Sequence, residues 1–157
     1  ITITDLAQVS RYGLLENALE KSASKKLVDD LGIKMSSIDQ WVSNLSGGNQ
    51  QKVVLAKWLF RDADVLIFDE PTRGIDVGAK YEIYLLLWKL AKLGKAIIIV
   101  SSDLPEILGS CHRILVFSNG KITGEVDRRE FDQEKILSMA YQEYIKTIDD
   151  EQRVSGS

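Results

Sequence analysis

The sequence is poor in residues that cross-link or interrupt a fold. Its 157 residues include one cysteine, one histidine and two prolines. A single thiol, Cys111, forms no internal disulfide, which excludes a disulfide-stapled module and fits a reducing compartment. A single histidine, His112, supplies neither a multi-histidine metal site nor a proton relay. We therefore expect both residues to have packing or surface roles.

Long apolar runs and an excess of one charge are also missing. The longest uninterrupted aliphatic run, 96–100, is far shorter than the roughly 20 residues that span a bilayer. The chain opens Ile-Thr-Ile-Thr-Asp, without the basic start or apolar stretch of a secretory signal. Lys and Arg number 20 against 23 Asp and Glu, so no strong positive field attracts nucleic acid. With 45% apolar residues, the composition predicts a soluble, cytosolic globular domain.

The first part of the chain has helical periodicity. Residues 1–43 contain none of the aliphatic runs seen later, and residues 27, 28 and 31 are apolar at helical spacing. Gly32 suits the end of that helix, because glycine tolerates the left-handed conformation found there. These patterns predict a helical subdomain over 1–45. A further helix is expected beyond it, over 49–60.

The periodicity changes from residue 65 onward. The apolar runs 65–68 and 96–100 are typical of buried strands, and the helical pattern 78–93 lies between them. Strand, helix and strand in this order predict a parallel βαβ unit.

The remaining sequence predicts a terminal hairpin and a last helix. Asp103 is placed to cap a short helix. Asn119-Gly120 is a strong two-residue turn signal between expected strands 114–117 and 122–126. The chain is thus predicted to be α/β. It divides into the helical segment 1–45, a core over 46–148 and a polar, flexible tail over 149–157.

One candidate binding segment is Leu45-Ser46-Gly47-Gly48-Asn49, just ahead of a helix. Glycines let a backbone approach a ligand closely, and the free N–H groups at a helix start attract anions. The Ser46 hydroxyl adds a donor, so this turn suits a terminal phosphate. Taken alone, the segment is more typical of a loop that only caps a helix.

A second candidate segment, 65–76, ends an apolar run with Asp69 and Glu70. Open α/β sheets bind ligands at the carboxyl ends of their strands. An acid there holds a Mg²⁺-bound water, and its neighbour orients or deprotonates an attacking water. Taken alone, the pair fits a solvated strand end equally well.

The order of the two segments is more specific than either one. Leu-Ser-Gly-Gly, a helix, an apolar strand, Asp-Glu-Pro-Thr and Gly-Ile-Asp resemble the ATP-binding cassette (ABC) ATPases over about residues 1–148. Asn49 and the run from Glu70 to Lys80 are similar to the second cassette of bacterial simple-sugar importers of the ribose, galactose or xylose type. The resemblance implies a P-loop NTPase fold: a partial helical subdomain, then a mostly parallel sheet with flanking helices and a terminal β-hairpin.

The resemblance also implies roles for residues of both segments, with ATP and Mg²⁺ as cofactors. Four nucleotide-binding residues form the signature loop, and a fifth belongs to the D-loop: Ser46, Gly47, Gly48, Asn49 and Asp76. Asp69 holds Mg²⁺ through water, and Glu70 is the catalytic base. Ser102 stands at the switch position, where most ABC ATPases have a histidine.

Two departures from the family pattern matter. No Gly-x-x-x-x-Gly-Lys-Ser/Thr P-loop occurs, because the Gly-Lys pairs at 94–95 and 120–121 lack the preceding glycine and the following hydroxyl. We therefore expect a fragment that starts inside a cassette and is inactive alone. Ser102 hydrogen-bonds a phosphate but carries no positive charge, and it agrees with the sugar-importer pattern.

The resemblance implies a division of labour between two cassettes that sandwich ATP head to tail. The signature loop serves the partner cassette's ATP, and Asp69 and Glu70 serve this cassette's own. The complete ATPase would energise sugar import on the inner face of the cell membrane, in the cytoplasm. Its partners would be the other cassette, the membrane permease subunits and, indirectly, a periplasmic sugar-binding protein, with no nucleic acid. The alternatives are an ABC-type ATPase without a transporter and a non-catalytic docking module with a decayed nucleotide site.

Overall fold

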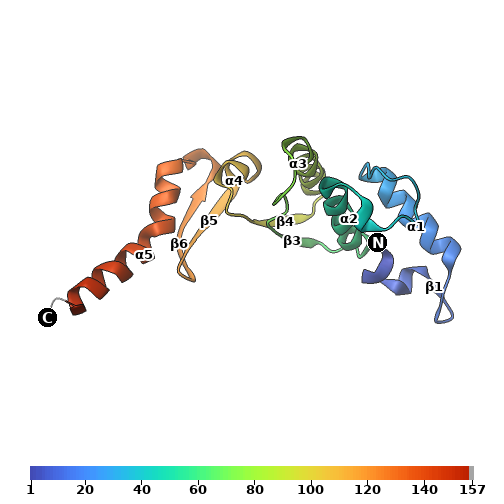
Figure 1. Cartoon of the computed structure of the whole chain (residues 1–157), viewed down its shortest axis with the longest axis horizontal. Coiled ribbons are helices and arrows are strands. Elements are labelled where there is room, and N and C mark those ends of the chain that lie inside the picture. Colours follow the sequence, from blue (N-terminus) through green and yellow to red (C-terminus); the bar gives the residue numbers. More distant parts are fainter. Residues whose placement is uncertain (156–157) are drawn as a thin grey trace. The chain divides into compact units, whose positions relative to one another are not determined.

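Two compact units make up the computed structural model, Ile1–Val100 and Ser101–Ser157, and each is described by itself (Figure 1). The backbone is described for residues 1–155, and side-chain surroundings for residues 1–143 and 145. Within these residues, no helix combines the length and the apolar character needed to cross a membrane.

The N-terminal part of the first unit contains a hairpin that the helical prediction for 1–43 missed. After two short 3₁₀ turns, strands β1 (Ser10–Arg11) and β2 (Leu14–Leu15) pair antiparallel. The two residues between them, Tyr12 and Gly13, have φ of +54° and +80°. Positive φ at both central positions is what a tight two-residue hairpin turn requires. Tyr-Gly lacks the Asn or Asp that usually marks such a turn, so the hairpin was missed and the segment was predicted to be helical from the spacing of its apolar residues.

Helices α1 (Asn17–Asp30) and α2 (Gly47–Phe60) follow in the first unit. Gly32, with φ of +58°, lies directly beyond the end of α1, as predicted. Helix α2 begins two residues before the predicted position, with Ser46 as its N-cap residue. Figure 1 shows α2 beside α1 and α3, and it packs against both.

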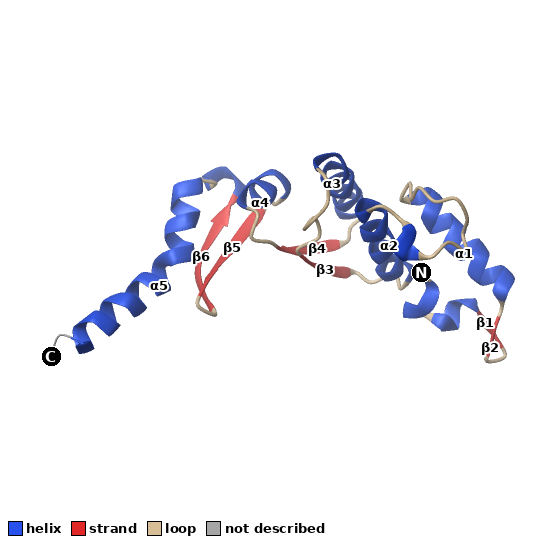
Figure 2. Ribbon diagram, viewed as in Figure 1, coloured by secondary structure: helices blue, strands red, loops and turns tan. Residues whose placement is uncertain are grey.

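The predicted parallel βαβ unit is confirmed. Strand β3 (Val65–Asp69), helix α3 (Val77–Lys92) and strand β4 (Ala96–Val100) follow in order, and β3 pairs parallel with β4 from Val65–Ala96 to Asp69–Val100. Figure 2 shows the two strands as a red pair beside α2 and α3. The core that they share with the helices is apolar and consists of Val28, Leu31, Ile33, Val53, Leu55, Ala56, Leu66, Phe68, Ile83, Leu87 and Leu90.

The prediction that these strands are buried is correct for one face only. Leu66 and Phe68 are 4% and 8% exposed, whereas the alternate residues Val65 and Ile67 are 55% and 66% exposed. Successive strand residues face opposite sides of a sheet, so one face lies on the helices and the other is open. The apolar runs thus indicated the strands correctly, but they did not show whether other parts of this chain cover one face of the sheet or both.

The second unit contains the predicted hairpin. Helix α4 (Leu104–Ser110) precedes β5 (Arg113–Ser118) and β6 (Lys121–Asp127), which pair antiparallel around Asn119-Gly120. Helix α5 (Gln133–Ser155) packs against both strands. The core of this unit contains Ile114, Val116, Val126 and Ile136. The tail predicted over 149–157 falls on the end of α5 as far as Ser155, and residues 156–157 lie outside the described residues.

Candidate functional site

The signature loop, residues 46–49, presents the Ser46 hydroxyl at the start of α2. Ser46 is exposed and has the extended backbone of an N-cap residue. Its side chain makes no capping bond to the helix; instead its Oγ accepts a hydrogen bond of 2.8 Å from Asn49 Nδ2. The hydroxyl therefore lies at the surface, at the positive end of the helix dipole, where anions are favoured.

Asn49 connects this loop to the segment that follows α1. Its Oδ1 accepts a hydrogen bond of 2.9 Å from the backbone N–H of Lys34, while its Nδ2 donates to Ser46. Both the oxygen and the nitrogen of the Asn49 amide are thus hydrogen-bonded to groups of this chain. The resemblance implied nucleotide binding for Asn49, which stays a prediction; the structure shows its amide hydrogen-bonded to the Ser46 hydroxyl.

The two glycines of the loop let α2 approach the start of α3. A Cβ on Gly48 would lie 2.6 Å from the Cβ of Ala79, and one on Gly47 would lie 3.2 Å from Ile75 Cγ2. Gly48 is buried in this contact. The sequence indicated that glycines here admit a ligand, and the structure gives Gly48 a second reason, the close passage of two helices.

Asp69 and Glu70 lie where β3 ends. Asp69 is exposed and stands opposite Val100 in the strand register. Glu70 is half-buried, and its backbone N–H donates to Val100 O at 2.8 Å, which continues the ladder for one residue. Its φ of +47° is left-handed, a conformation that costs a residue with a Cβ roughly 1–2 kcal/mol. The chain thus turns sharply at the predicted base, directly after the predicted metal-binding acid.

Asp76 caps helix α3. Its Oδ1 accepts a hydrogen bond of 3.0 Å from the backbone N–H of Ala79, the residue that contacts Gly48. The D-loop is therefore anchored at the point where α3 meets α2. The structure thus brings Asp76 and the signature loop together, through Ala79.

Lys52 is a residue of this region that the sequence analysis did not single out. It is 5% exposed, and its Nζ donates to Gly32 O at 3.0 Å and to Glu82 Oε2 at 2.7 Å. The hydrogen bond and the positive charge of Lys52 hold the pKa of Glu82 below its ordinary value. The available signal was its position on α2, one turn before the buried Leu55 and Ala56, where a lysine interrupts an apolar stripe.

Ser102, the switch-position residue, belongs to the second unit. It is exposed and precedes Asp103, whose side chain caps α4 by accepting from Glu106 N at 3.3 Å, as predicted. Glu106 is itself buried and accepts from Ser101 Oγ at 2.7 Å. The other predicted site residues all lie in the first unit.

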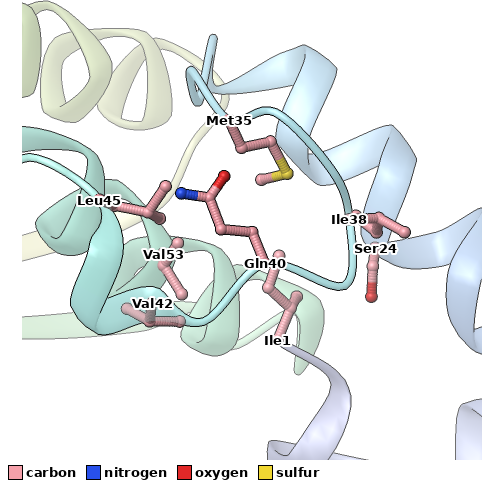
Figure 3. Close-up of a pocket in the computed structure, with 8 residues that line it drawn as sticks. All are labelled: Ile1, Ser24, Met35, Ile38, Gln40, Val42, Leu45 and Val53. Atoms are coloured by element: carbon pink, nitrogen blue, oxygen red, sulfur yellow. The ribbon is translucent and has the colours of Figure 1, made fainter.

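The cavities near these residues are small. One of about 100 Å³ lies beside the signature loop, with the Gln40 side chain among Met35, Leu45 and Val53 (Figure 3). Another of about 120 Å³ is lined by Asp69 and by residues of α2. Ligand pockets usually measure about 300–1,000 Å³, so neither of these encloses a nucleotide.

Other reactive groups do not extend the site. Cys111 is half-buried, and burial raises the pKa of its thiol, with the Glu106 carboxylate adding to the effect. The packing role predicted for it agrees with its contact to the core of the second unit. Among the described residues, no three His, Cys, Asp or Glu side chains form a metal-binding group.

Comparisons with known proteins agree with the motifs. Residues 5–73 match the ABC transporter family. The L-arabinose transport ATP-binding protein of Geobacillus stearothermophilus is 53% identical over 88% of this chain and 27% of its own length. The galactose/methyl galactoside import ATP-binding protein of Treponema pallidum is 51% identical over 88% of this chain and 28% of its own. The xylose import ATP-binding protein of Thermoanaerobacter pseudethanolicus is 53% identical over 89% and 28%. The chain thus spans about a quarter of the length of these relatives.

Solved structures show the same fold. The dimeric ATP-binding cassette MJ0796, bound to ADP and Pi, matches 77% of this chain and 52% of its own, with a TM-score of 0.64 and 23% identity. The cassette MJ1267 matches 83% of this chain and 53% of its own, with a TM-score of 0.69 and 21% identity. Together with the order of the signature loop, the acidic strand end and the D-loop, these likenesses show that the chain is similar to the ATPases of the ABC transporter family, and in particular to the ATP-binding proteins of sugar importers.

Proposed function

We propose that this chain is part of the ATP-hydrolysing subunit of a sugar importer. The observation that carries the proposal is identity of 51–53% to arabinose, galactose and xylose transport or import ATP-binding proteins over almost nine-tenths of the chain. An ABC-type ATPase without a transporter is not favoured, because each of these relatives is named for transport or import.

The signature loop serves the ATP of a partner cassette. Its hydroxyl is exposed at a helix start, and the nearby cavity of about 100 Å³ is too small to enclose a nucleotide. A surface anion site of this kind is completed by a second body that carries the phosphates. The dimeric cassette bound to ADP and Pi is a solved relative of the same fold, and it supports a second cassette as that body.

Asp69 and Glu70 serve the nucleotide of their own cassette. Mg²⁺ usually binds through one or two carboxylates together with waters and substrate phosphates, so the exposed Asp69 carboxylate fits this ion as one ligand, through water. The ion would neutralise charge on the phosphates. Glu70 follows in the left-handed turn and accepts a proton from the attacking water. Ser102 takes the place of the switch histidine as a neutral hydrogen-bonding group.

We infer the remaining partners from the likeness to proteins that are named for transport or import. The complete ATPase would sit in the cytoplasm on the inner face of the membrane and move permease subunits between two states as the cassettes close and reopen. A periplasmic sugar-binding protein would deliver the sugar and contact this chain only indirectly.

Ser46→Arg tests the head-to-tail assignment in a complete two-cassette protein that contains this sequence. The arginine would occupy the position of the terminal phosphate, so hydrolysis at the partner's site should fall while nucleotide binding at this cassette's own site stays near normal. Ser43→Arg, at an exposed serine three residues earlier, is the control and should leave both unchanged. Loss of local binding with intact turnover at the partner's site would contradict the assignment.

A further inference from the structure

Lys52 is a buried cation that joins three segments of the first unit. Its side chain is 7% exposed, and its two acceptors are Gly32 O, just beyond α1, and Glu82 Oε2, on α3. We call these three residues the Lys52 clamp. A buried ammonium group is costly unless it is paired and hydrogen-bonded, so both acceptors are needed to keep it in place.

The clamp lies one helical turn beyond the contact between Gly48 and Ala79. Lys52 is four residues after Gly48 on α2, and Glu82 is three residues after Ala79 on α3. Residues three or four apart lie on the same side of a helix. Two contacts in succession, one of close packing and one of charge, therefore hold the first turns of α2 and α3 side by side.

Both segments to which the resemblance assigns nucleotide-binding residues, the signature loop and the D-loop, lie at this pair of helix starts. The signature loop, residues 46–49, forms the N-cap and first turn of α2, and Asp76 of the D-loop caps α3. A single contact would let one helix start pivot against the other, whereas two contacts along the axis oppose such a pivot. The acceptor at Gly32 adds the end of α1 to the same rigid group.

We propose that Lys52 is a positioning residue that holds the signature loop in a fixed relation to the D-loop, so that the signature loop reaches the partner cassette's nucleotide in the correct orientation. The kinetic part of this proposal, the effect of Lys52 on turnover at the partner's site, rests on the proposed function. The mechanical part, the coupling of the starts of α2 and α3, does not. Lys52 acts through other residues, because its ammonium group is enclosed and already donates to two acceptors of its own chain.

The chain offers a matched control. Lys21 forms an ion pair of 3.2 Å with Asp39, also in the N-terminal part, but the two side chains are 51% and 68% exposed. Exposed pairs contribute little, so Lys21→Met removes a lysine and an ion pair without disturbing the helix starts. Lys52→Met keeps most of the aliphatic stem and removes the charge. Glu82→Gln removes the acceptor charge from a half-exposed position, where unfolding is not expected.

Hydrogen exchange of a complete two-cassette protein tests the mechanical part. In Lys52→Met, amides of the first turns of both α2 and α3 should exchange roughly tenfold faster, and Glu82→Gln should shift the same two segments less. Lys52→Arg, which keeps the charge and the donors, should restore protection. Faster exchange in α2 alone, or the same change in Lys21→Met, would overturn the proposal.

Turnover at the partner's site tests the kinetic part, with Ser46→Arg as reference. Lys52→Met should lower kcat roughly tenfold to a hundredfold, the usual cost of a small misplacement, with KM for ATP within about twofold. Recovery of kcat in Lys52→Arg would support positioning; unchanged kcat in Lys52→Met would overturn it. If Ser46→Arg itself has no effect, the proposed function fails, and hydrogen exchange alone then decides whether Lys52 couples the two helix starts.

Discussion

The two candidate segments of the first unit are positioned in different ways. Asp69 and Glu70 are placed by strand pairing, since β3 runs in register with β4 up to Asp69–Val100 and the Glu70 amide adds one more ladder bond. The signature loop is placed by side chains from distant segments: Asn49 holds the Lys34 amide, and Lys52 holds Gly32 and Glu82. The acids therefore depend on local register, and the loop depends on tertiary contacts.

The largest expected effect is the absence of ATP hydrolysis and of tight MgATP binding when the two segments act without a P-loop. These 157 residues contain no P-loop, and the cavities beside the candidate segments measure only about 100 and 120 Å³. We predict that the 157-residue chain does not hydrolyse ATP and binds MgATP weakly or not at all, because the main phosphate-binding nest is missing. Titration calorimetry is the measurement, and a micromolar dissociation constant would show that the two segments suffice.

The next effect isolates the strand end. In a complete two-cassette protein, Glu70→Gln keeps the size of the side chain and removes the proton acceptor. Turnover at this site should fall about 10²–10⁴-fold, the usual contribution of a positioned base, while MgATP stays bound. Single-turnover hydrolysis beside nucleotide retention, with the partner site disabled, measures both.

Asp69→Asn, in the same experiment, distinguishes Mg²⁺ binding from proton transfer. This change weakens the group expected to hold Mg²⁺ through water, so nucleotide retention should fall together with turnover. Unchanged hydrolysis in Glu70→Gln would remove Glu70 from catalysis. If the cassette with Glu70 intact also fails to hydrolyse ATP, the neutral Ser102 would point to a regulatory site.

The contrast also explains which parts of the fold could be predicted. Strand pairing follows from contiguous apolar runs, so β4 was predicted with its bounds and the acids were placed at the end of β3. The support of the signature loop comes from residues 15 to 30 positions away in the chain, and no local pattern indicates such partners. The β1–β2 hairpin was missed for a related reason, because its turn uses Tyr12 in a conformation that tyrosine rarely adopts.

Gly48→Ala tests whether the loop depends on close packing. The added Cβ would meet Ala79 Cβ at 2.6 Å, so the two helices must move apart. Overpacking of this kind typically costs about 1–3 kcal/mol, which should lower the thermal midpoint by several degrees. Gly109→Ala, in α4 with no atom within 4 Å of the added Cβ, is the control and should be neutral or slightly stabilising. Ala79→Gly should recover part of the loss in Gly48→Ala; equal losses with and without it would contradict the packing explanation.

The smallest expected effect concerns the charge in the same helix contact. The hydrogen bond and the charge of Lys52 lower the pKa of Glu82 below its ordinary value of 4.5, and Lys34 lowers it further, while desolvation and the charge of Asp76 oppose them. A carboxyl group with a depressed folded-state pKa adds stability that is complete above its unfolded pKa and is lost as the pH falls through the folded value.

Glu82→Gln should therefore lower the thermal midpoint at pH 7. It should differ less from the wild type as the pH falls below about 4.5 and on through the lower folded-state pKa of Glu82, where the native carboxyl group also becomes neutral. Asp39→Asn is the control, because its ion pair with Lys21 is exposed on both sides and should contribute little at either pH. Thermal midpoints of the two variants and the wild type at pH 7 and at pH 4 make the comparison. A Glu82→Gln difference that is the same at both pH values would show that the Lys52–Glu82 contact acts by packing rather than by charge, and that the charge on Glu82 plays no part in holding α2 against α3.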